Sequence, residues 1–338
     1  MENLKGFRAR FILFLRRYTI LAILVGMLIV CSLISPRFFS LGNFHNILTQ
    51  AAPMGVICVG ATFLMISGYR DLSVGMVMGL SAALTMGLQP LLGIFSIFAG
   101  MLAGVLVGLI NGLLVSYGGM HTFVVTMATM QGVRSLTYIY TQEKSIVGII
   151  PEFASFGAGD FLGISNLLWV FLIAIVVMEL VLRLTRHGKD TYAVGGNKDA
   201  AFNAGINVHR TVVTNFIICS LAGSIGGILY AARANSTTAT LGWPDSHFLV
   251  MVMVVLGGTK LSGGYGNELF TFGGVFVYYI LQNVMNMLNV NTYYATLSTG
   301  ILLIIVLLLD KLINPISAFK RTEASITPKT VRPDKGTP

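Results

Sequence analysis

The sequence predicts an all-α protein that spans a membrane about ten times, and three observations carry this prediction. Hydrophobic residues make up 55% of the 338 residues and charged residues only 10%, whereas a soluble domain carries about 25% charged residues. The apolar residues gather into runs close to the ~20 residues that a helix needs to cross a bilayer. The positive charges behind the net charge of +9 flank these runs, which is typical of cytoplasmic loops and argues against nucleic-acid binding.

Ten apolar runs are the candidate spans. The first, 18–35, follows a basic N-terminal segment (1–17) and lacks the small-residue cleavage site of a signal peptide, so we interpret it as an uncleaved span. Segment 43–50 is too polar and too short to span, and we expect it to lie along the outer surface. The later spans are predicted at 52–68, 72–88, 91–117, 122–141, 166–184, 211–231, 246–257, 268–288 and 294–313.

The charge between the spans predicts the topology. Loop 142–165 has a net negative charge and suits the outside, whereas 183–210 has a net positive charge and suits the cytoplasm. Six spans separate the basic N-terminus from this middle loop, and four separate the loop from the basic tail, 314–338. All three basic regions therefore fall on one side, with both termini in the cytoplasm. We expect one transmembrane domain over 18–313 and a disordered tail rich in Lys, Thr and Pro.

Composition and motifs give no sign of an enzyme. The three cysteines, Cys31, Cys58 and Cys219, lie in apolar runs and are predicted to be buried free thiols. The histidines are scattered, without the spacing of a metal site. The chain has no Gly-x-x-x-x-Gly-Lys-[Ser/Thr] loop for phosphate, so we expect it to bind neither ATP nor another cofactor.

A polar break at 67–73 interrupts two apolar segments. Ionisable groups near a bilayer are costly and usually functional, which singles out Asp71. Its carboxylate can also cap the helix that resumes behind it. A weak internal repeat of this break occurs later in the sequence. The same spacing of Gly, Leu, Ser and Gly is found in Gly68-x-x-Asp-Leu-Ser-x-Gly75 and in Gly257-x-x-Lys-Leu-Ser-x-Gly264. Transporters are commonly built from such repeats.

Four stretches carry a family resemblance. They are Ile66-Ser-Gly-x-x-Asp-Leu-Ser-Val-Gly75, Phe123-Val-Val-Thr126, Gly195-Gly-Asn-Lys-Asp-Ala-Ala-Phe-Asn-Ala-Gly-Ile206 and Leu256-Gly-Gly-Thr-Lys-Leu-Ser-Gly-Gly-Tyr-Gly266. In this order the chain resembles, over about 18–313, the membrane-spanning permeases of ribose/galactose/xylose-type ABC importers. The resemblance implies that the chain forms half of a dimeric pore in a bacterial inner membrane and that this pore imports a monosaccharide or related polyol. It also implies a solute-binding protein outside, an ATPase subunit that binds ATP inside, and a second permease copy or paralogue. The pair Tyr69-Arg70 departs from the small or aliphatic residues usual before the Asp, which puts the particular sugar in doubt.

Other functions remain open at this level. A permease of the same class could carry another small polar solute, such as a nucleoside, a signalling furanose or a branched-chain amino acid. An ion-coupled secondary transporter would work without an ATPase and would need an acidic residue in mid-membrane, for which Asp71 is the main candidate. A membrane enzyme would need a clustered acid, His or nucleophile set, which the sequence lacks.

Polar residues within the spans are candidates for the substrate path, because hydroxyl and amide groups suit a neutral sugar. The same groups can equally join helices. Arg134 is the stronger candidate, since a charge in mid-segment demands a partner or water. The candidates are Asp71, Ser73, Asn111, Thr126, Gln131, Arg134 and Gln282, with Asn215, Asn283 and Asn286 also noted. Glu179 is predicted instead to pair with Arg183, four residues on.

Two further patterns concern helix packing and partner contact. Gly100, Gly104, Gly108 and Gly112 form a small-residue stripe that favours close helix packing, with a substrate groove as the alternative. In the middle loop (about 185–210), Asn197 is predicted to cap a short helix over 198–204, and Gly205 to end it in a left-handed conformation. The resemblance implies that this region, with Asn197, Lys198, Asp199 and Gly205, couples the permease to the ATPase.

Overall fold

The computed structural model describes residues 26–29, 36–291, and positions 293, 294, 297, 298, 300, 301, 304 and 308. The chain divides into two compact units, residues 1–291 and residues 292–338. The described positions of the second unit are helical. The predictions for the N-terminal segment, for most of the first and last spans, for Cys31 and for the C-terminal tail lie outside the described residues.

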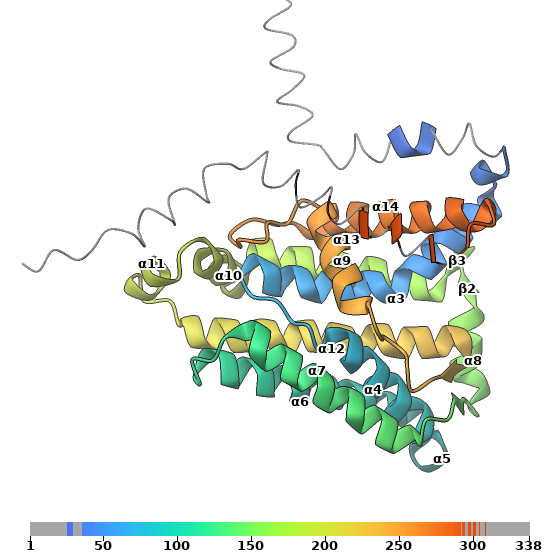
Figure 1. Ribbon diagram of the computed structural model, residues 1–338, viewed down its shortest axis with the longest axis horizontal. Helices are drawn as coiled ribbons and strands as arrows, with labels where there is room; N and C mark the ends of the chain where they lie inside the picture. The colour runs from blue at the N-terminus through green and yellow to red at the C-terminus, as the bar shows by residue number, and fades with distance from the viewer. Residues whose placement is uncertain are drawn as a thin grey trace, which may run out of the picture. The chain divides into compact units, whose positions relative to one another are not determined.

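The first unit is built almost wholly from helices, which confirms the all-α prediction for the described part of the chain (Figure 1). Two pairs of two-residue strands join loops, β1 (Ile146–Val147) with β4 (Ser236–Thr237) and β2 (Asp160–Phe161) with β3 (Ile164–Ser165), both antiparallel. The helices are η1 (Pro36–Phe39), α3 (Leu41–Ile66), α4 (Val74–Gly87), α5 (Gln89–Leu92), η2 (Gly93–Phe95), α6 (Ser96–Ser116), α7 (Thr122–Thr141), α8 (Pro151–Ala158), α9 (Asn166–Leu184), α10 (Arg186–Gly196), α11 (Lys198–Asn203), α12 (Val208–Ala234), α13 (Ser246–Leu256) and α14 (Glu268–Met287).

Each span predicted between 52 and 288 coincides with a helix of the first unit. Among the described residues, four stretches are long and apolar enough to cross a membrane: α3, the run from Gln89 to Ser116, α9 and α12. Helices α4 and α13 are apolar but have only 14 and 11 residues. Helices α7 and α14 have 20 residues each and fall outside this set because they carry more polar groups. The count of ten spans stays a prediction.

The prediction of a separate surface segment at 43–50 is wrong, because α3 is one continuous helix from Leu41 to Ile66. The Ser40 hydroxyl caps it by accepting the N–H of Asn43 at 3.3 Å. The Asn43 side chain exchanges two hydrogen bonds with Asn283 of α14, at 3.1 and 2.8 Å. These tertiary bonds satisfy an amide whose polarity argued against a span. Pro53 lies inside the helix.

Helix α12 is the centre of the unit and packs most extensively against α6, α3 and α4 (Figure 1). The predicted glycine stripe makes the α6 contact possible. A Cβ at Gly108 would lie 2.6 Å from the Phe216 carbonyl oxygen, and a Cβ at Gly112 would lie 2.8 Å from the Val213 Cα. The stripe therefore packs against backbone, as small residues in membrane helices do, and does not line a groove.

The two polar breaks have the same helix ending. After α3, Gly68 (φ 86°) donates to the Met65 carbonyl and Tyr69 to the Leu64 carbonyl. After α13, Gly258 (φ 86°) and Thr259 make the equivalent bonds to Val255 and Val254. Both are Schellman motifs, in which glycine takes the left-handed position. Gly258 is thus the structural equivalent of Gly68. The sequence comparison aligned Gly68 with Gly257, so that alignment is wrong by one residue.

Two side-chain predictions are confirmed. Arg183 pairs with Glu179 on α9. Glu179 also accepts the Asn267 amide at 3.1 Å and the Glu268 N–H at 3.0 Å, so it ties α9 to the first turn of α14. Cys58 and Cys219 are buried free thiols.

Candidate functional site

Asp71 is the centre of a buried polar cluster where α4 begins. One carboxylate oxygen accepts the Ser73 N–H at 2.7 Å, the Ser73 hydroxyl at 2.6 Å and, more weakly, the Asn111 amide at 3.5 Å. The other oxygen accepts the Ser220 hydroxyl at 3.1 Å. The Asn111 amide also donates to the Ser73 hydroxyl at 3.0 Å. Three of the predicted residues therefore meet, and the carboxylate does cap a backbone N–H directly ahead of α4.

Sequence reasoning missed the members of this cluster that come from α7 and α12. The Thr129 hydroxyl donates to the side-chain amide oxygen of Asn111 at 2.7 Å. Ser81 donates to Ser224 at 2.8 Å, and the Ser224 hydroxyl donates to the Ser220 carbonyl. Ser220 and Ser224 stand four residues apart in an apolar helix, a polar stripe that could have indicated this role.

No described cation pairs with Asp71, although Arg70 is its neighbour. The guanidinium of Arg70 donates to the Leu261 carbonyl at 2.5 Å and so crosses to the second polar break. Asp71 is 5% exposed, and Ser73, Asn111 and Ser220 are fully buried. Hydroxyl, amide and backbone donors therefore satisfy the carboxylate in place of a counter-ion. A charged or polar group in a protein interior is tolerated only when it is hydrogen-bonded or paired in this way.

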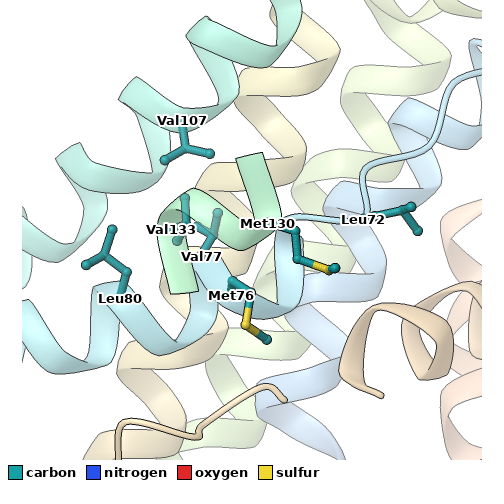
Figure 2. Close-up of a cluster of buried hydrophobic side chains, with 7 residues drawn as sticks. All are labelled: Leu72, Met76, Val77, Leu80, Val107, Met130 and Val133. Carbon is teal, nitrogen blue, oxygen red and sulfur yellow. The ribbon is translucent and has the colours of Figure 1, made fainter. Parts of the chain in front are cut away.

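An apolar cluster adjoins these polar groups and holds α4, α6 and α7 together. Figure 2 shows its side chains, contributed by all three helices. They are Leu72, Met76, Val77, Leu80, Val107, Met130 and Val133. Leu72 stands between Asp71 and Ser73 in the sequence, so the apolar cluster begins directly beside the polar one.

The other predicted path residues of α7 have different environments. Thr126 is fully buried, and its hydroxyl donates to the Thr122 carbonyl one turn earlier at 2.9 Å. Gln131 is exposed. Arg134 is half-buried, with its guanidinium carbon 3.8 Å from the centroid of the Trp243 ring and 5.3 Å from that of Tyr138. The partner predicted for the Arg134 charge is therefore an aromatic ring, which it meets in a cation–π contact.

The remaining candidates lie away from the Asp71 cluster. Gln282 bonds to the Tyr278 hydroxyl at 2.9 Å within α14. Asn283 belongs to the α3 contact described above, and Asn286 is exposed. Asn215 of α12 bonds to His187 at 2.8 Å and to Thr191 at 3.2 Å. Asn215 therefore anchors α10.

The middle loop forms the predicted capped helix. The Asn197 side chain accepts the N–H groups of Asp199 and Ala200, both at 3.0 Å, and α11 follows over Lys198–Asn203. Gly205 has φ 81° and closes a Schellman motif. Phe202 is 66% exposed on this short helix. The cap prediction is confirmed, with the helix one residue shorter than expected, and an aromatic side chain stands out on its surface.

The described residues offer little for metal chemistry. No three of their His, Cys, Asp or Glu side chains lie close enough together to hold a metal ion.

Comparison with known proteins gives one consistent family. The model of the branched-chain amino acid transport system / permease component family matches residues 43–307. The ribose import permease protein of Bacillus subtilis is 38% identical over 293 residues, which are 84% of this chain and 89% of that protein. No solved structure matches the chain significantly.

Two relatives from Escherichia coli K12 extend this picture. The L-arabinose transport system permease is 31% identical over 87% of this chain and 90% of its own length. The D-allose transport system permease is 31% identical over 90% and 94%. These relatives confirm the resemblance to monosaccharide permeases drawn from the motifs. Since the family model spans most of the chain and such relatives match nearly its whole length, the chain belongs to this family of transport-system permease components.

Proposed function

We propose that this chain is the membrane-spanning subunit of an ABC importer that carries a monosaccharide or related small polyol across a bacterial inner membrane. The observation that carries the proposal is the near full-length similarity to permeases named for ribose, L-arabinose and D-allose. In this proposal the chain has about ten spans and cytoplasmic termini, and ATP is bound by a separate ATPase subunit. A solute-binding protein delivers the sugar, and a second permease copy or paralogue completes the pore.

We place the substrate path beside Gln131 and Arg134 of α7. This helix is 20 residues long yet too polar to rank with the apolar spans, and it exposes Gln131. A polar side chain on a helix within a membrane faces protein or water rather than lipid. Gln131 and Arg134 would then contact the solute. Asp71, Ser73 and Asn111 would stand behind α7 and position it through Thr129.

The coupling surface in this proposal is α11 with its flanking loop. The helix is exposed, its cap residue Asn197 orders it, and Phe202 presents an aromatic side chain to a partner. Large aromatic residues dominate the binding energy of many protein interfaces. ATP-driven closure of the ATPase pair would push α11, and the helices would rock to open the path to the other side.

Phe202→Ala is expected to weaken binding of the ATPase subunit about tenfold, the effect of losing one well-placed aromatic anchor. ATP-driven uptake should fall while the permease stays folded, since Phe202 is largely exposed. The control is Phe95→Ala, because Phe95 is equally exposed (67%) in η2. Binding measured on the detergent-solubilised permease should distinguish the two, and equal affinities would remove α11 from the interface.

The proposed function is tested by purifying the tagged permease from its native host in mild detergent and identifying what accompanies it. A stoichiometric ATPase with its own phosphate-binding loop, and ATP-dependent uptake of labelled ribose in proteoliposomes with the binding protein, are the expected results. Solute movement by the chain alone without ATP would instead indicate a secondary transporter.

A branched-chain amino acid is the second candidate solute, because the family model bears that description. The same proteoliposomes decide between the two when labelled leucine replaces ribose. Uptake of leucine in preference to ribose, L-arabinose and D-allose would favour the amino acid.

A further inference from the structure

Three backbone segments from distant parts of the sequence touch one another without intervening side chains. They are residues 66–68 at the end of α3, Gly195 in the last turn of α10, and residues 263–264 after α13. The Gly264 N–H donates to the Ile66 carbonyl at 2.7 Å. A Cβ at Gly195 would overlap the Ile66 carbonyl oxygen and lie 2.6 Å from the Gly264 nitrogen. A Cβ at Gly263 would lie 2.8 Å from the Gly68 Cα and 3.1 Å from the Gly195 carbonyl oxygen. We name this contact the glycine junction.

Two side chains reinforce the glycine junction. The Tyr192 hydroxyl of α10 donates to the Gly266 carbonyl at 2.7 Å. Arg70 donates to the Leu261 carbonyl at 2.5 Å, which joins the two polar breaks directly. Helix α10 is therefore fastened to the second break, and the second break to the first.

The glycine junction lies between the coupling helix and the buried cluster. Gly195 is three residues before Lys198, where α11 begins. Gly68 is three residues before Asp71, whose carboxylate holds the start of α4. Near its other end, α10 is anchored to α12 by the His187–Asn215 bond. A force on α11 therefore acts at the end of α10 that touches both breaks.

We propose that the glycine junction transmits the displacement of α10 and α11 to the two broken helix pairs, and that Gly195 is a positioning residue for translocation. The proposal rests on the proposed function, in which an ATPase pushes α11. Contacts between side chains can absorb a small displacement by changing rotamer, whereas backbone packed on backbone has no such freedom and must move together. The glycines serve this contact, since any side chain at Gly195 would separate α10 from the breaks.

The test compares Gly195→Ala with Gly196→Ala in the complete importer in proteoliposomes. Gly196 is the matched control, because a Cβ there would meet no atom within 4 Å. The readout is the number of ribose molecules imported per ATP hydrolysed, which a loss of folded protein alone would not change. We expect Gly195→Ala to lower this ratio at least about fivefold, a typical allosteric coupling, and Gly196→Ala to leave it unchanged.

A second variant keeps the test decisive if Gly195→Ala does not fold. Tyr192→Phe removes only the hydrogen bond to Gly266. It should lower the same ratio about twofold, which is less than the effect expected of Gly195→Ala. Tyr265→Phe is its control, since Tyr265 is 52% exposed. An unchanged ratio in the folded variants overturns the role of the glycine junction. Absence of ATP-driven uptake in the wild-type complex would overturn the proposed function instead.

Discussion

Asp71→Ala is expected to lower the free energy of unfolding by about 3 kcal/mol or more, because each buried donor left without an acceptor costs about 1–3 kcal/mol. The substitution strands the Ser73 N–H, the Ser73 hydroxyl and the Ser220 hydroxyl, which all donate to this carboxylate. The start of α4 and its contact with α12 should loosen together. Denaturant unfolding of the purified permease in detergent measures the effect.

Two controls separate structure from transport at this position. Asp160→Ala removes an exposed carboxylate paired with His45 and should change stability by less than about 1 kcal/mol. Asp71→Asn keeps an accepting oxygen and should retain most of the stability. If Asp71 positions α7, this variant keeps ATP-driven uptake. A stable Asp71→Asn protein with no uptake would contradict a positioning role and favour direct action of the carboxylate in transport.

Gly108→Leu is expected to destabilise the permease by at least about 3 kcal/mol, the upper part of the range for overpacking. Its side chain would enter the backbone of α12, since even a Cβ would lie 2.6 Å from the Phe216 carbonyl oxygen and 2.8 Å from the Ile217 Cα. Backbone cannot turn aside as a flexible side chain can, so α6 and α12 must separate.

The matched control for Gly108 is Gly132→Ala on α7, where a Cβ would meet no atom within 4 Å. Replacing a helical glycine in open space should leave stability unchanged or raise it by about 0.5–1 kcal/mol. Thermal unfolding and size-exclusion chromatography in detergent report both variants. A Gly108→Leu protein as stable as the wild type would show that α6 and α12 are not in backbone contact.

Local patterns were predictable because their physics lies within a few residues. Asn197 and Gly205 bracket α11 since capping and a left-handed turn need only neighbouring backbone groups. The Glu179–Arg183 pair follows from helical spacing. The helices at the eight predicted spans between 52 and 288 follow from the length of the apolar runs, and family motifs predicted the transport class.

The polarity of a short stretch gives a wrong prediction where its polar group has a hydrogen-bond partner far away in the sequence. The amide of Asn43 made 43–50 look like a surface segment, yet Asn283, 240 residues away, satisfies it. The same limit explains why Thr129 was missed, since nothing near it in the sequence shows that its hydroxyl reaches Asn111.

By itself, the sequence determined the helical class, the positions of most helices, the cap of α11 and the family of transport permeases. Only the tertiary structure decided which polar residues meet, that Arg70 turns from Asp71 to Leu261, and that three glycine-containing motifs converge on one contact. The physical reason is the distance along the sequence over which each interaction acts. Caps, helix periods and apolar lengths are set by neighbouring residues, whereas a buried hydrogen bond or a backbone contact depends on segments that only the packed helices bring together.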